Sequence, residues 1–171
     1  MEEAEQIEQD IVKGMENDRK IAEGYILEYN DRLNYYNFLK QEWLDGLNVP
    51  AGENCGGGKS NLPGNPTEAI AIKKAQYDME HPEYLWLRAV EIALKTFGER
   101  KRIFIVVRCE AEAKAQIYHG KKSWVVYTQR RYSEEIAKRY INANGWLGER
   151  TVKAWWRQIL DCIVEVHLRL K

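Results

Sequence analysis

Apolar residues recur at intervals of three and four over two long stretches of this chain, and this spacing predicts an amphipathic helix in each. The first stretch runs from about residue 21 to 47, with Lys40 as its one interruption, and contains Ala22, Ile26, Tyr29, Leu33, Tyr36, Trp43 and Leu47. The second contains Val152, Trp156, Ile159, Ile163, Val166 and Leu170. We therefore expect an all-α fold with a long N-terminal helix, a helical core and a second long helix beginning near Glu149.

Helix signals also fill the middle of the chain. Pro66, at the first helical position after Asn65, predicts a helix start, and Pro82 predicts its end and the start of a helix that reaches Phe97. Residues 99 to 116 are expected to form a buried helix, although the run IFIVV at 103–107 is rich in β-branched residues. The alternative is a small β-hairpin that pairs 102–108 with 122–128.

Four segments follow from this pattern. They are an N-terminal helical arm at 1–48, a loop at 49–65, a central helical region at 66–118 and a basic C-terminal module at 119–171. The loop contains GENCGGGKS, which ends like a phosphate-binding loop. Glu53 replaces the first glycine of that pattern and no strand precedes it, so we interpret the segment as a connection between helices.

Charge is segregated along the chain, although the formal net charge is zero. Residues 1–50 hold 12 acidic and 5 basic side chains, whereas residues 121–171 hold 5 acidic and 11 basic ones. A basic C-terminal end of this kind favours a polyanionic partner. The three cysteines are far apart, and no run of apolar residues is long enough to span a membrane. These features favour a cytoplasmic protein that does not associate with membranes.

The basic module predicts a helix-turn-helix. Ser133 is expected to cap a short bracing helix that begins with two glutamates, and glycines at 145 and 148 mark the connection to the second helix. The apolar stripe of that second helix faces inward, with Trp156 in the core and Trp155 against the bracing helix or a partner. The predicted DNA-binding residues are Lys121, Lys122, Arg130, Arg131, Ser133, Arg150, Thr151, Lys153 and Arg157.

The order of these parts resembles the phage late-transcription regulators of the RinA and ArpU type, whose C-terminal module is similar to region four of bacterial sigma factors. The resemblance is carried by LEYNDRLNYYNFLKQE, NPTEAIAIKKA, and YSEEIAKRY with ERTVKAWWRQIL. It implies binding to double-stranded DNA upstream of phage operons and cooperation with host RNA polymerase in the bacterial cytoplasm. The resemblance also implies that Glu149 faces the DNA, together with Arg150, Thr151, Lys153 and Arg157. This sequence departs from the pattern in the insertion KAQIYHGKKSWVVYTQ and in the long turn after Tyr140.

Enzymatic activity is not expected. His81, His119 and His167 lie far apart, and no catalytic residue, metal site or cofactor is predicted. His167 is expected to interact favourably with a helix C-terminus. A DNA-binding regulator, with a homodimer formed through the N-terminal helix, is the preferred function. The alternatives are a small terminase-type packaging subunit that forms a ring and a helical scaffold protein that does not bind DNA.

Overall fold

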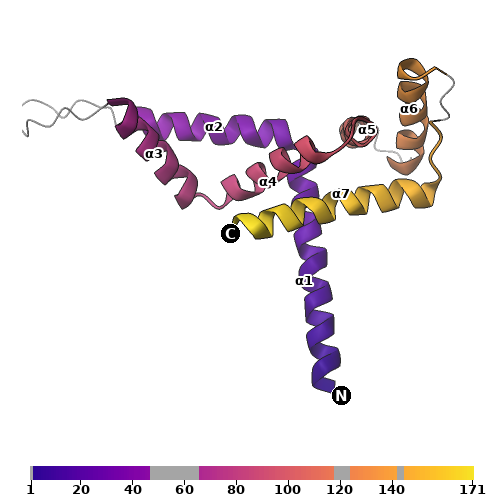
Figure 1. Cartoon of the computed structure of the whole chain (residues 1–171), viewed down its shortest axis with the longest axis horizontal. Helices are drawn as coiled ribbons and strands as arrows, with labels where there is room; N and C mark the ends of the chain where they lie inside the picture. Colours follow the sequence, from indigo (N-terminus) through magenta and orange to yellow (C-terminus); the bar gives the residue numbers. More distant parts are fainter. Residues whose placement is uncertain (1, 47–65, 118–123, 142–144) are drawn as a thin grey trace, which may run out of the picture. The chain divides into compact units, whose positions relative to one another are not determined.

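The computed structural model describes residues 2–46, 66–117, 124–141 and 145–171, and these contain seven helices and no strand. In chain order the helices are α1 (Glu2–Leu27), α2 (Tyr29–Gly46), α3 (Pro66–Glu80), α4 (Glu83–Thr96), α5 (Glu99–Ile117), α6 (Trp124–Arg139) and α7 (Glu149–Leu170) (Figure 1). The all-α prediction is confirmed. The hairpin alternative is not realised, because 102–108 lies in α5 and 124–128 lies in α6.

The expected single helix at 21–47 is wrong. Glu28 forms a turn that separates α1 from α2, and α1 begins much earlier, at Glu2. The chain forms two compact units, one of Met1–Tyr29 with Leu85–Lys171 and the other of Asn30–Tyr84, so the two halves of the expected helix belong to different units. Packing within each unit therefore overrides an apolar pattern that continues past the turn at Glu28. The predicted segment boundaries near 48, 65 and 118 fall at residues outside the described ranges and stay predictions.

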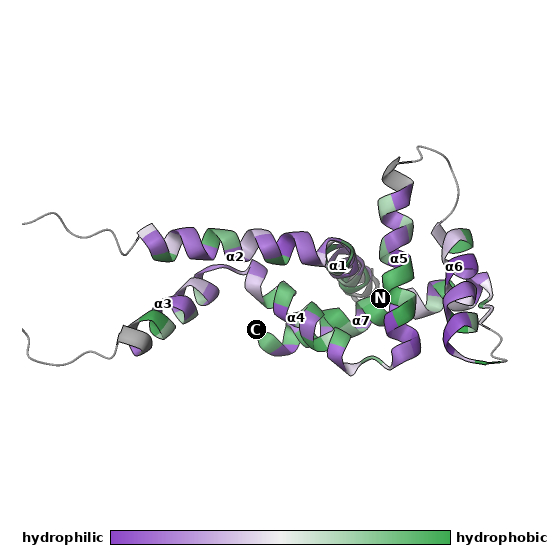
Figure 2. Ribbon diagram, turned by 90° about the horizontal axis from the view of Figure 1, so that it is seen from above, coloured by the Kyte–Doolittle hydropathy of each residue, from purple (hydrophilic) through white to green (hydrophobic). Residues whose placement is uncertain are grey.

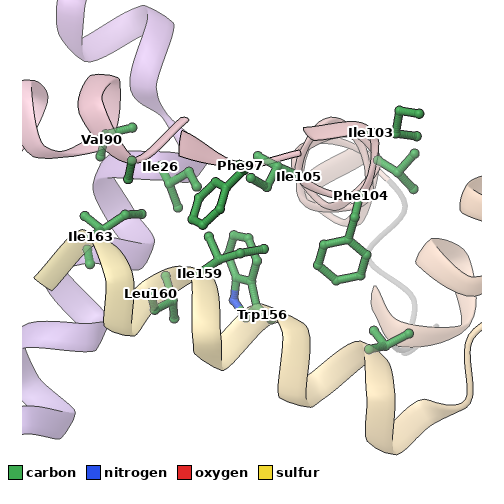
Figure 3. Packing of buried hydrophobic residues seen from close by; sticks show 14 of the residues in the cluster. Ile26, Val90, Phe97, Ile103, Phe104, Ile105, Trp156, Ile159, Leu160 and Ile163 are labelled. Carbon is green, nitrogen blue, oxygen red and sulfur yellow. The ribbon is translucent and has the colours of Figure 1, made fainter. Parts of the chain in front are cut away.

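The larger unit is built around α4, α5, α6 and α7 with the C-terminal half of α1. Apolar residues concentrate on α4, α5 and α7 (Figure 2). Ile26 of α1, Val90 of α4 and Ile163 of α7 lie in one buried cluster, which continues through Phe97 and Ile159 (Figure 3). The N-terminal half of α1 extends beyond these helices, and its Ile7, Ile11 and Met15 are exposed (Figure 1).

The β-branched run at 103–107 lies inside α5. Ile103, Phe104, Ile105 and Val107 are all buried, whereas Val106 is exposed. The helix propensity of such residues is lower than that of alanine by less than about 1 kcal/mol each. Burial of a large apolar side chain gives about 1.5–3 kcal/mol, so packing decides the structure of this segment.

The smaller unit contains α2 and α3, joined by polar contacts and by an edge-to-face contact between the rings of Tyr36 and Tyr77, whose centroids lie 5.5 Å apart. Asp78 of α3 accepts hydrogen bonds from Tyr36 Oη at 2.6 Å and from Lys40 Nζ at 2.5 Å. The ring of His81 stacks on Tyr77 with centroids 3.8 Å apart, and its Nδ1 lies 2.8 Å from the Tyr77 carbonyl oxygen. The helix end at Glu80 and the restart after Pro82 agree with the predicted positions.

Candidate nucleic-acid interface

The helix before the C-terminal connection is longer than predicted. Because α6 begins at Trp124, Ser133 lies inside the helix and does not cap its start, so that prediction is wrong. The buried positions show why the helix extends upstream. Val125, Gln129, Tyr132 and Ile136 recur at steps of three and four and form one face that continues past the serine.

The connection between α6 and α7 is held against α6 by two contacts. The Gln129 side-chain amide donates a 2.8 Å hydrogen bond to the Leu147 carbonyl oxygen. At Gly145 the backbone passes so close to α6 that an added Cβ would lie 2.7 Å from Ile136 Cβ and 3.1 Å from Ser133 Cα. These contacts fix where α7 leaves the connection. Residues 142–144 lie outside the described ranges.

The inner face of α7 matches the predicted stripe at most positions. Val152, Trp156, Ile159 and Ile163 are buried, but Leu170 is exposed. Trp155 packs against the bracing helix as expected, since its ring lies 6.0 Å from that of Tyr132, in an edge-to-face arrangement.

The outer face of the first turns of α7 is polar and exposed. It carries Arg150, Thr151, Lys153 and Arg157, while Glu149 pairs with Lys153 at 2.6 Å. Arg150, Lys153 and Arg157 follow one another at steps of three and four, so they share one side of the helix. Neither Arg150 nor Arg157 forms an ion pair within the described part of the chain. Two cations on this face are therefore available to an external anion.

The predicted basic residues of α6 are instead engaged in contacts within the protein. Arg130 Nε lies 3.1 Å from Glu134 Oε1. Arg131 contacts Glu134, Glu135 and Glu110, and the hydrogen bond to Glu134 together with these neighbouring charges raises the pKa of its guanidinium. Lys121 and Lys122 lie outside the described residues, so the structure says nothing of their role.

A groove runs beside this outer face, between α1 and α7. Its volume is about 570 Å³, and it is lined by Glu16, Arg19, Lys20, Trp124, Lys153, Trp156, Arg157 and Leu160. Arg19 Nε is bound to Asp161 Oδ1 of α7 at 2.5 Å, which ties the two helices together. Sequence reasoning missed the cations of α1 because they lie in an acidic segment. No local pattern shows that α1 packs on α7.

The wall of the groove is supported by a buried cation. The guanidinium carbon of Arg108 lies 4.5 Å from the Trp124 ring centroid and 5.1 Å from that of Trp156. Its Nη2 lies 3.3 Å from Glu23 Oε1, the atom that also accepts a 2.8 Å hydrogen bond from Trp156 Nε1. Arg108 therefore joins α1, α5, α6 and α7 at the base of this site.

The described residues show neither a metal site nor a membrane span. No group of three or more histidines, cysteines or acidic residues among them could hold a metal ion. None of the helices that the structure describes is long and apolar enough to cross a bilayer. Comparison of the chain with protein-family models, curated proteins and solved structures finds no match in any of the three.

Proposed function

We propose that this chain is a sequence-specific regulator of transcription that binds double-stranded DNA through the first turns of α7. The observation that carries the proposal is the division of α7 into two faces. The inner face is buried, whereas Arg150 and Arg157 on the outer face are exposed and have no ion pair within the described residues. Arginine is well suited to guanine edges and to phosphate, and the major groove admits one α-helix.

The fixed connection supports this assignment. A helix that reads base edges has to be presented in one orientation, because hydrogen bonds to bases are directional. Gly145 and the Gln129 hydrogen bond hold the start of α7 against α6, which acts as the bracing helix. Exposed cations without a fixed orientation would favour binding to DNA of any sequence.

The resemblance to phage late-transcription regulators supports a narrower proposal. In this proposal the chain acts on phage late genes together with host RNA polymerase, in the cytoplasm of the host bacterium, without catalytic activity or a cofactor. The exposed Ile7, Ile11 and Met15 on the projecting part of α1 support a contact with a second copy of the chain.

Selection from a pool of random duplexes tests the proposal. The wild-type protein is expected to enrich one sequence motif, and the variant with Arg150→Glu and Arg157→Glu is expected to enrich none. The matched control carries Arg169→Glu and Lys171→Glu, which make the same charge change at the exposed far end of α7. The control is expected to enrich the wild-type motif.

Two results would overturn the proposal. If the wild-type protein enriches no motif and binds no duplex at low salt, the result supports the alternative of a helical scaffold protein that does not bind DNA. If light scattering shows that it binds duplexes as a large closed ring, the result supports the terminase-type packaging subunit. A regulator is expected to be a monomer or dimer.

A further inference from the structure

The groove between α1 and α7 has cations on both sides. Arg19 and Lys20 come from α1, and Lys153 and Arg157 come from α7, with Glu16 as the single acidic residue in the lining. Arg19 and Lys153 are engaged with Asp161 and Glu149. Lys20 and Arg157 form no ion pair within the described residues, so one unpaired cation lies on each side of the groove.

An aromatic wall accompanies these cations. Trp124 lines the groove and is half-buried, and the guanidinium of Arg108 lies over its ring. Trp156 lies behind it, with the two ring centroids 6.5 Å apart. Since Arg108 is itself buried and bound to Glu23 and Glu112, the position of the Trp124 ring is fixed before any ligand arrives.

This combination selects one kind of ligand. Unpaired cations bind phosphate, and an exposed aromatic surface binds the flat face of a base. The volume of about 570 Å³ lies within the range of pockets that hold small organic ligands, so a lone phosphate would leave most of it empty. We propose that the groove binds a nucleotide unit, with its base against Trp124 and its phosphate between Lys20 and Arg157.

This site overlaps the proposed duplex-binding face of α7 but is not identical to it. The two share Arg157 and Lys153, but Lys20 belongs to the groove alone and Arg150 belongs to the α7 face alone. The nucleotide can come from a single strand of nucleic acid or from free solution. The groove proposal goes beyond duplex binding and does not depend on it.

Two probes and three variants separate these sites. The probes are a fluorescent oligothymidylate of about eight nucleotides, within the usual site size for single strands, and a labelled duplex. The variants are Lys20→Glu, Arg150→Glu and the control Lys13→Glu, which changes an exposed lysine of α1 outside the groove. Binding is measured by anisotropy at about 0.15 M salt, where charges on distant surfaces are largely screened. Circular dichroism checks that each variant is folded.

For the single strand, Lys20→Glu is expected to weaken binding about tenfold or more, because a charge-assisted contact is lost. Arg150→Glu and Lys13→Glu are expected to leave it within about twofold of wild type. Duplex binding is expected to show the reverse, with loss in Arg150→Glu and little change in Lys20→Glu. A wild-type protein that binds the single strand but not the duplex would refute the proposed function and leave the groove proposal standing.

Competition with thymidine monophosphate identifies the source of the nucleotide. Displacement of the oligonucleotide at millimolar concentration would indicate a site for a single nucleotide unit, free or at a strand end. Binding of the oligonucleotide that depends on Lys20 but resists the mononucleotide would indicate a continuous strand. The groove proposal is wrong if the wild-type protein does not bind the single strand, or if Lys20→Glu binds the single strand as tightly as Lys13→Glu.

Discussion

The imidazole of His167 stacks on the indole of Trp86, with ring centroids 3.6 Å apart and planes 9° from parallel. This contact packs the C-terminal half of α7 against α4. His167 is only 3% exposed, and burial, helped by the positive charge of Lys171, lowers the pKa of its imidazole, although the backbone of Leu85 and the charge of Asp18 oppose the shift. His167 lies in the last turn of α7, as the sequence predicts, but its burial opposes the charged form that would interact best with the helix C-terminus.

Stability is consequently expected to fall in mild acid. Below the ordinary histidine pKa of 6.5 the unfolded chain takes up a proton at residue 167 that the folded protein resists. The free energy of unfolding then decreases with falling pH, by at most about 1.4 kcal/mol per pH unit, until the pH passes below the folded-state pKa. Denaturant titrations between about pH 5.5 and 7.5 measure this decrease.

The matched variant is His167→Phe, which keeps a ring against Trp86 but does not titrate. It should lose most of the pH dependence in this interval. The carboxylate of Glu91, on the same helix as Trp86, does not contribute to the pH dependence between pH 5.5 and 7.5, because hydrogen bonds from Lys95 and Arg88 lower its pKa. An unchanged pH profile in His167→Phe would show that another group causes the effect.

Replacement of Gly145 by alanine should destabilise the protein. The new methyl group would lie within 3.0 Å of Ile136 Cγ2 and close to the backbone of Ser133, so the connection or α6 has to move. Overpacking of this kind costs about 1–3 kcal/mol. The free energy of unfolding from urea titration checks the expectation.

Gly148→Ser is the control for this substitution. Among the described residues, apart from its two chain neighbours, no atom lies within 4 Å of an added Cβ at Gly148, which occupies the N-cap of α7 without a side-chain hydrogen bond. A serine hydroxyl can cap that helix, so stability should stay the same or rise slightly. Equal stability of Gly145→Ala and wild type would contradict the close packing of the connection.

The substitution Arg108→Lys should lower the free energy of unfolding by about 2 kcal/mol, although it keeps the positive charge. Lysine loses the planar contact with the rings of Trp124 and Trp156 and cannot bind Glu23 and Glu112 through a fork of two nitrogens. Chemical unfolding followed by tryptophan fluorescence measures the loss. Arg102→Lys, at an exposed position of α5, should change stability by less than about 0.5 kcal/mol, and a similar effect of both changes would rule out a special role for Arg108.

Local sequence signals predict the helices well where one face packs into one core. The stripe from Val152 to Ile163 sets the orientation of α7, and Pro82 marks the boundary between α3 and α4. The same stripe places Arg150 and Arg157 on the outer face, so part of the candidate site follows from spacing alone. The exposed face of α7 is predictable because it lies opposite the buried apolar face.

Features that depend on distant contacts are not predictable in this way. Neither proline nor glycine marks the turn at Glu28, where the chain passes from one compact unit to the other. The engagement of Arg131 requires Glu110 of α5, and the groove requires Lys20 of α1 to lie near Arg157. Spacing along one helix carries no information on which helix packs against it.

The most direct test of DNA binding by α7 is the salt dependence of duplex affinity, measured by fluorescence anisotropy. For the wild-type protein the logarithm of the association constant should fall linearly with the logarithm of salt concentration. In the variant with Arg150→Glu and Arg157→Glu the affinity should collapse, and the slope of any residual binding should shrink by about 0.9 for each lost phosphate contact. A folded variant with the affinity and slope of the wild-type protein would contradict DNA binding by this face of α7.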